Sequence, residues 1–187
     1  PEIIEKYAER WDWIELSHNI NFTEHNLAEY YQSKLNLVKF YEHVASRRRE
    51  PAVYHFTHMF NAIEIIRSRK ILSRNKAQSI GLLKYDAAGS VVNRTEKAHP
   101  YARFYFRTGT QTQFYNEFLG KQVGSRYYSR AEDNGVPMCP MPIFFKFDLQ
   151  EVLMAYGDRC YYSTGNMQST AARIKQVVKE PTALAVN

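Results

Sequence analysis

The stretch VYHFTHMFNAIEIIRSRKIL, Val53–Leu72, decides how the middle of this chain folds. Its first residues are β-branched and aromatic, which is typical of a short strand, and they predict one over AVYHF. The residues that follow, HMFNAIEIIRSRK, predict a helix. Within this helix Met59, Ile63 and Ile66 fall at i, i+4 and i+7, and we expect the apolar stripe that they form to be buried.

Two histidines and a threonine lie where the predicted strand meets the predicted helix: His55, Thr57 and His58. The plain interpretation is a strand–turn–helix joint, in which each histidine is a capping or core residue. The alternative is a ligand pocket, because the free N–H groups of a helix start and short polar side chains can hold the polar groups of a ligand. The joint by itself leaves both interpretations open.

The composition is that of a folded protein with a surplus of basic residues. Of the 187 residues, 44% are hydrophobic and 24% are charged, which suits one substantial domain or a domain with an appendage. The net charge of +6 favours a polyanionic partner such as nucleic acid, although charge alone leaves this open. The chain has two separate cysteines and no apolar run of membrane length, so we expect a cytoplasmic protein with no membrane partner.

Common nucleotide-binding and hydrolase motifs are missing from the sequence. No GxGxxG follows a predicted strand, and GKQVGS at Gly120 lacks the Gly-Lys-Ser/Thr order of a P-loop. HExxH and GxSxG do not occur, and no His/Cys cluster has metal-ligand spacing, so we expect no metal site.

Residues 1–50 differ in pattern from the rest of the chain. EIIEKYAERWDWIEL and LAEYYQSKLNLVKFYEHVASRRRE both have helical periodicity, and they predict a helical N-terminal extension over residues 1–50. The closing SRRRE is either a nucleic-acid contact or a solvated helix end, and a run of this kind is more often the second.

Residues 51–187 mix helical and strand patterns and predict an α+β domain. Strands are predicted in YARFYF, PMPIFFKFDL and DRCYYST, and helices in LQEVLMAY and TAARIKQVV. The last residues, ALAVN, read as a strand that stops in mid-course, so we expect the domain to be truncated at its C-terminal end.

An aromatic segment with two arginines, HPYARFYFRTGTQTQFYNEFLG, stands out in this domain. Arg103 and Arg107 lie among aromatic residues that lead into a turn rich in Thr, Gly and Gln. Aromatic faces beside guanidinium groups can stack planar rings and hold phosphate together. The alternative is a buried aromatic strand with its arginines on the solvent side, which the spacing alone favours.

Five blocks of the chain resemble, in order, those of DarT-type toxins, which are bacterial NAD-dependent ADP-ribosyltransferases that modify nucleic acid. The resemblance covers the chain from Ala52 to its C-terminus and leaves residues 1–50 outside. The blocks are YHFTHMFNAIEIIRSRKILSRN, DAAGSVVNRT, YARFYFRTGTQTQFYNE, CPMPIFFKFDL and YYSTGN.

The resemblance implies an ADP-ribosyltransferase-like split β-sandwich, with NAD as the substrate in its cleft. It implies that the strand–helix joint and a Tyr-Phe floor face each other across that cleft. The positions it implies for NAD binding are His55, Thr57, His58, Asn61, Ser73, Tyr105 and Phe106. Those it implies for binding the acceptor substrate are Arg107, Thr110, Gln111 and Gln113.

ADP-ribosyl transfer breaks the bond between nicotinamide and ribose through an oxocarbenium-like transition state. The site has to hold the pyrophosphate with a cation, stack the nicotinamide and place a carboxylate near the ribose. Arg94, in SVVNRT, matches the family's catalytic arginine. The family's catalytic glutamate lies on a late strand, which we expect beyond Asn187, and Glu180 is not assigned this role.

The resemblance further implies a toxin or anti-phage effector that modifies bases of single-stranded DNA, with RNA as the second candidate polymer. An antitoxin protein is then an expected partner. The alternative is a non-catalytic module of the same fold that binds NAD or nucleic acid.

Overall fold

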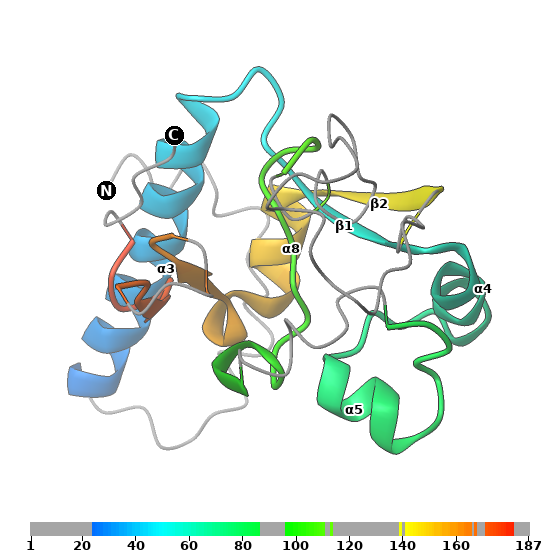
Figure 1. The fold of residues 1–187 in the computed structure, drawn as a ribbon. Helices are drawn as coiled ribbons and strands as arrows, with labels where there is room; N and C mark the ends of the chain where they lie inside the picture. The colour runs from blue at the N-terminus through cyan, green and yellow to red at the C-terminus, as the bar shows by residue number, and fades with distance from the viewer. Residues whose placement is uncertain are drawn as a thin grey trace. The chain divides into compact units, whose positions relative to one another are not determined.

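The computed structural model describes residues 24–86, 96–110, 113, 139, 141–165, 167 and 171–181 (Figure 1). The chain forms two compact units. The first contains Pro1–Glu50, Gln150–Gly165 and Arg173–Asn187, and the second contains Pro51–Leu149 and Asn166–Ala172. The helix predicted in EIIEKYAERWDWIEL and the strand predicted in ALAVN lie outside the described residues. The division into an extension and a transferase domain stays a prediction.

The first unit is built on the predicted helix of the N-terminal extension, α3, which spans Glu24–Ala45. The ring of Phe40 lies 5.3 Å from that of Tyr162, and both side chains are buried. Asn36 donates from Nδ2 to the carbonyl of Val178 at 2.6 Å, so a buried amide joins α3 to the end of the chain. The buried apolar side chains described in this unit are Leu37, Phe40, Val44, Leu153, Tyr162 and Val177.

Two short strands in this unit correct one prediction and confirm part of another. The strand β3, Tyr161–Ser163, lies within the predicted DRCYYST. It pairs antiparallel with β4, Ile174–Gln176, so the helix predicted in TAARIKQVV is wrong. The next residue, Val177, is 1% exposed and donates its N–H to Cys160 at 3.0 Å. Pairing with the preceding strand and burial of Val177 outweigh the weak helical preference of the local sequence.

The helix predicted in LQEVLMAY is confirmed as α8, Leu149–Tyr156, and a 3-10 turn, η3, follows at Gly157–Arg159. Glycine at position 157 leaves room for the Leu37 side chain of α3. A Cβ added there would lie 2.5 Å from Leu37 Cδ1, which is closer than real contacts allow.

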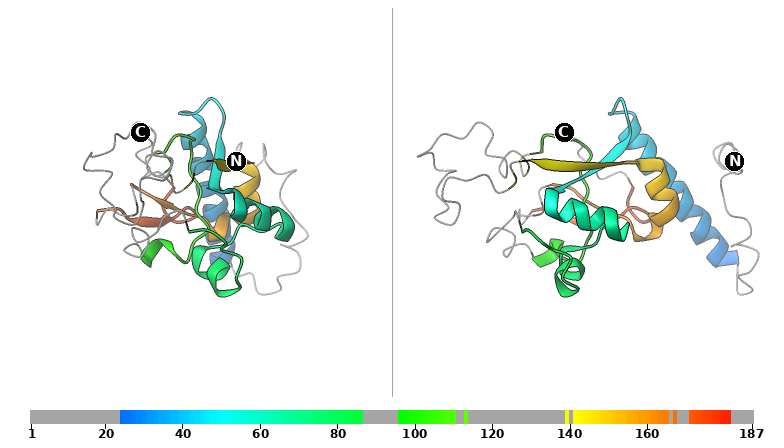
Figure 2. Two further views of the ribbon diagram at one scale, coloured as in Figure 1. Left: turned by 45° about the vertical axis from the view of Figure 1, so that its right-hand side comes forward. Right: turned by 90° about the vertical axis from the view of Figure 1, so that its right-hand side faces the viewer.

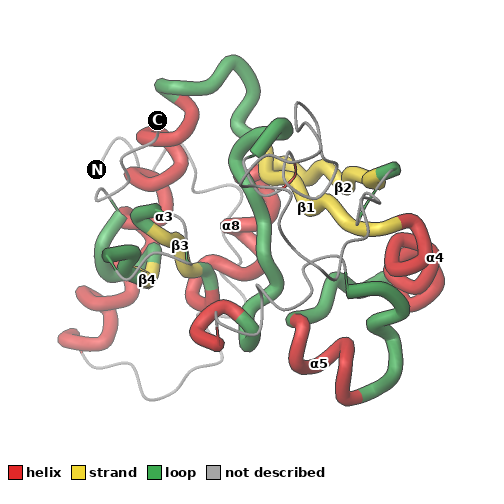
Figure 3. Tube along the Cα trace, viewed as in Figure 1, coloured by secondary structure: helices red, strands yellow, loops and turns green. Residues whose placement is uncertain are grey.

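The second unit is organised around β1, Ala52–His58, and β2, Pro142–Asp148, which confirm two predicted strands. They pair antiparallel with His55 opposite Phe145, and Figure 3 shows them side by side in yellow. At the end of β1 the chain turns into α4, Met59–Ser68, which runs back along the strand pair (Figure 2). This confirms the predicted strand and the predicted helix that follows it.

The apolar stripe of α4 was predicted to be buried, and that prediction is wrong. Met59 and Ile63 are each 38% exposed and Ile66 is 64% exposed, whereas Ala62 is the only buried residue of this fully described helix. Helical spacing shows that apolar residues share a face but does not show which element covers that face. Here α4 turns its smallest apolar side chain inward.

Three further segments complete the described part of this unit. The helix α5, Arg74–Ser79, was not predicted, and the 3-10 turn η2 covers Glu96–Ala98. The strand predicted in YARFYF is wrong except for one isolated bridge, in which Tyr54 and Tyr105 exchange N–H···O bonds of 2.7 and 2.8 Å. The chain thus mixes helices with small antiparallel sheets, and the α+β prediction is confirmed. The split β-sandwich stays a prediction.

Candidate functional site

The candidate site is centred on β1, which has neighbours on both edges. β2 pairs along one edge and Tyr105 bridges to Tyr54 on the other. Side chains alternate along a strand, so Tyr54, Phe56 and His58 share one face and His55 and Thr57 share the other. The rings follow this alternation, because Phe56 packs 5.5 Å from Tyr105 and 6.1 Å from Phe144.

His55 sits in an aromatic cluster on its face of the sheet. Its ring lies 5.9 Å from Phe104 and 6.5 Å from Phe145, and Phe104 meets Phe147 edge-on at 5.8 Å. Its Nδ1 lies 2.9 Å from the carbonyl oxygen of Arg103. A carbonyl only accepts hydrogen bonds, so Nδ1 carries the proton and a neutral His55 presents an accepting lone pair at Nε2.

Burial lowers the pKa of His55 from its ordinary value near 6.5. The hydrogen bond to the Arg103 carbonyl opposes this shift, and the positive charge of Arg103 adds to it. Desolvation dominates because it disfavours the charged imidazolium. His55 is therefore a neutral acceptor at neutral pH.

We expect acid to destabilise the fold partly through His55. Its folded pKa is lowered, so below about pH 6.5 the unfolded chain binds more protons than the folded one. The contribution is fully present above that pH and is lost as the pH falls through 6.5 towards the lowered value. Urea unfolding between pH 7.5 and pH 5 should show a steeper loss of stability in the wild type than in His55→Asn. Equal slopes would contradict this assignment.

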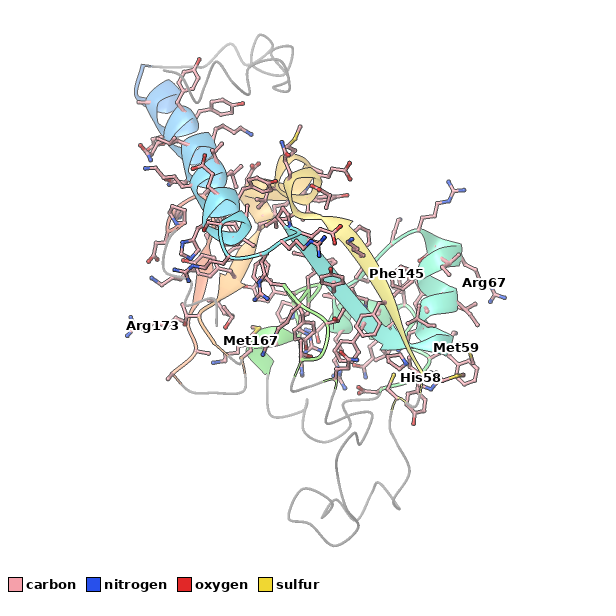
Figure 4. All side chains as sticks on the ribbon, turned by 90° about the horizontal axis from the view of Figure 1, so that it is seen from above. His58, Met59, Arg67, Phe145, Met167 and Arg173 are labelled. Carbon is pink, nitrogen blue, oxygen red and sulfur yellow. The ribbon has the colours of Figure 1, made fainter. Side chains whose placement is uncertain are left out.

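His58 caps α4 and stacks on a side chain from a later loop. Phe60 donates its backbone N–H to His58 Nδ1 at 3.2 Å, so a neutral His58 carries its proton on Nε2. The imidazole is stacked on Tyr85 with centroids 4.1 Å apart and an interplanar angle of 24°. Figure 4 labels His58 and Met59 where β1 passes into α4, with Phe145 on the neighbouring β2.

Asn61 joins this helix start to the loop at Lys84 and Tyr85. Its Nδ2 donates to the carbonyl of Tyr85 at 2.6 Å and to Thr57 Oγ1 at 3.3 Å. Its Oδ1 accepts the backbone N–H groups of Lys84 and Tyr85, each at 2.9 Å. A side-chain amide offers two donors and two acceptor lone pairs, so these four bonds use its full capacity.

Ser73 caps the helix α5, and the residue after it holds the same loop at the next position, Asp86. Ser73 caps α5 by accepting the N–H of Lys76 at 3.3 Å. Arg74 forms an ion pair with Asp86, whose carboxylate directly follows Tyr85. The hydroxyl of Ser73 therefore accepts a capping hydrogen bond, and the neighbouring Arg74 anchors the loop.

The resemblance implied that the Tyr-Phe segment faces the joint across a gap, but the structure does not show this arrangement. Tyr105 forms an isolated bridge to Tyr54 of β1, and its ring packs on Phe56, so the two segments lie side by side. Phe106 is half-buried and Arg107 is exposed. Tyr105 therefore supports β1, whereas Arg107 is accessible.

Thr110 and Gln113 form a tight turn with each other. Gln113 donates its N–H to Thr110 Oγ1 at 3.2 Å, and its Oε1 accepts the N–H of Gly109 at 2.8 Å. Their side chains are 7% and 9% exposed, so these contacts are shielded from solvent. Gly109 has φ +70, a conformation that favours glycine. The predicted roles of Arg94 and Gln111 fall outside the described residues.

The structure thus places His55, Thr57, His58 and Asn61 in one strand–helix joint, with Tyr105 on the adjacent edge of β1. His55 and Thr57 lie on one face of β1 and His58 on the other. Sequence reasoning missed Tyr85, Phe104 and the carbonyl of Arg103. These residues lie far along the chain from the joint that they contact, and no local pattern marks such long-range partners.

The described residues contain no group of three or more His, Cys, Asp or Glu side chains placed to hold a metal ion. None of their helices is long and apolar enough to cross a membrane.

The part of the chain that contains the strand–helix joint matches a family of ADP-ribosyltransferases. Residues 54–187 match the model of a family described as DarT, ssDNA thymidine ADP-ribosyltransferase. The match covers most of the chain, which therefore belongs to the DarT family. No curated protein and no solved structure matches the chain.

Proposed function

We propose that this protein transfers ADP-ribose from NAD to bases of single-stranded nucleic acid, with DNA as the main acceptor. The match to DarT over residues 54–187 carries this proposal, because it begins inside β1 and contains the joint described above. In this role the protein is a toxin or anti-phage effector, and its expected partner is an antitoxin protein. RNA is the second acceptor to be tested.

The aromatic cluster around His55 fits the nicotinamide end of NAD. Its Nε2 offers an acceptor, and the neighbouring rings of Phe104 and Phe147 are each 36% exposed. A carboxamide has N–H donors and lies in the plane of an aromatic ring, so it can donate to an imidazole while its ring packs on phenylalanine. These groups bind and orient the ring that leaves during transfer.

Polar groups at the start of α4 fit the ribose and phosphate parts of NAD. Thr57 accepts a hydrogen bond from Asn61, so its own hydroxyl proton is left to donate to a ligand. His58 donates through Nε2 when it is neutral. Arg94 supplies a positive charge for the pyrophosphate, and Arg107 is an exposed cation for the acceptor strand.

Labelled NAD, incubated with the full-length protein and separate oligonucleotides, tests the proposal. We expect label on a single-stranded DNA that contains thymidine and much less on a matched DNA in which every thymidine is replaced. RNA and duplex DNA of the same sequence give the remaining comparisons. NAD binding without label on any polymer would favour the non-catalytic module instead. Absence of NAD binding would defeat the transfer reaction and leave only a module that binds nucleic acid.

A further inference from the structure

We infer that Asn61 is a positioning residue that orients two NAD-binding side chains without touching NAD. Family resemblance suggests a direct contact at this position. The structure instead uses all four hydrogen-bonding positions of its amide within the protein. The inference rests on the proposed function, because Thr57 and His58 are the NAD contacts that it concerns.

The first effect of Asn61 is on Thr57. Asn61 Nδ2 donates to Thr57 Oγ1 at 3.3 Å, so the hydroxyl oxygen already accepts a bond from within the protein. A hydroxyl has one proton and rotates it towards an available acceptor. Asn61 therefore keeps this proton pointing away from itself and leaves it to donate to a ligand.

The second effect reaches His58 through Tyr85. Asn61 holds both the N–H and the carbonyl of Tyr85, at 2.9 and 2.6 Å. This pairing resembles one rung of a β-ladder and fixes the position of the Tyr85 backbone. Its ring then stacks on His58 at 4.1 Å. The Arg74–Asp86 ion pair anchors the next residue, so the loop is held at consecutive positions.

His58 is consequently held from two sides. The N–H of Phe60 occupies Nδ1, and the Tyr85 ring covers one face. These contacts fix the direction of the remaining nitrogen, Nε2, which is the atom that can donate to a ligand. Loss of Asn61 should free the Tyr85 backbone, and with it the stack that orients His58.

A double-mutant cycle on NAD affinity separates positioning from direct contact. We expect Asn61→Ala and Tyr85→Ala each to weaken NAD binding about tenfold, which is the scale of one hydrogen bond. Asn61 acts on Thr57 directly and on His58 through the Tyr85 stack, so Asn61→Ala already removes the effect of the Tyr85 ring. The double variant should therefore be no more than about threefold weaker than the worse single variant. Losses that multiply to about a hundredfold would overturn the inference.

Asn36→Ala is the matched control for the loss of a buried amide. Asn36 accepts from Gln32 at 2.9 Å and donates to Val178 at 2.6 Å, but it belongs to the first unit. The Asn36→Ala substitution should lower the melting temperature and leave NAD affinity unchanged. An equal loss of NAD affinity in Asn36→Ala would mean that the Asn61 effect is general destabilisation, and would overturn positioning.

A second measurement needs no NAD and so separates this inference from the proposed function. The Tyr85 ring shifts the NMR signals of the His58 ring protons because the two rings are stacked. We expect this shift to disappear in both Tyr85→Ala and Asn61→Ala, and to persist in Asn36→Ala. A His58 signal that changes with Tyr85 but not with Asn61 would overturn the inference even if the protein binds NAD. Failure of NAD binding with the expected shifts would count only against the proposed function.

Discussion

Replacement of Arg94 by alanine is expected to reduce transfer of labelled ADP-ribose to single-stranded DNA by about a hundredfold to a thousandfold. We propose Arg94 as the catalytic arginine because of its resemblance to the DarT family, and the pyrophosphate of NAD needs a cation while the nicotinamide leaves. A guanidinium binds phosphate oxygens through two parallel N–H groups. The measurement is the initial rate at saturating oligonucleotide, with NAD varied so that kcat and KM are separated.

Two variants make the Arg94 result specific. Arg94→Lys keeps the positive charge but loses the planar fork, so it should retain more activity than alanine and less than the wild type. Arg67→Ala removes an arginine whose side chain is 72% exposed and pairs only locally with Glu64 among the described contacts. Figure 4 shows it on the outer side of α4. It should transfer at the wild-type rate. An Arg94→Ala protein as active as Arg67→Ala would remove the catalytic assignment.

The largest expected loss of stability comes from Phe40→Ala. Phe40 is 2% exposed, packs on Tyr162 and is among the largest fully buried side chains described. Deletion of a buried phenylalanine ring removes its burial and leaves a cavity, which together cost about 3–5 kcal/mol. Urea unfolding followed by circular dichroism measures the difference. The whole free energy of unfolding of a small domain is only about 5–15 kcal/mol. A loss of this size should therefore leave the first unit largely unfolded at physiological temperature.

Phe60→Ala is the control for residue type. Phe60 is 51% exposed, so the same substitution should cost less than about 1 kcal/mol. Similar midpoints for the two variants would show that α3 does not form the core of its unit. A midpoint change confined to Phe40→Ala would support the packing of α3 against β3.

Much of the local structure could be predicted from the sequence. The α3, β1, α4, β2 and α8 elements all follow from periodicity, β-branched and aromatic content, and breakers at their ends. The order of five sequence blocks also predicted the DarT family, which the match over residues 54–187 confirms. The signals for the individual elements are short-range, because each is contained within a window of one helix or strand.

The tertiary structure decided which faces are buried and which distant groups meet. It exposed the apolar stripe of α4, and it made a strand of Ile174–Gln176 by pairing it with β3. It also brought the side-chain amide of Asn61 into hydrogen bonds with Tyr85, 24 residues later in the chain. A short window of sequence carries no information on which distant segment will pack against it. The choice of that segment depends on the packing of the whole unit.

The strand–helix joint itself was therefore fixed by the residues of Val53–Leu72, whereas the state of its side chains was not. Which nitrogen of His55 or His58 carries the proton depends on the carbonyl of Arg103 and on the N–H of Phe60. The capacity of Thr57 to donate depends on Asn61. Hydrogen bonds satisfy groups pairwise, so the chemistry of each side chain is set by the partner that the fold brings to it.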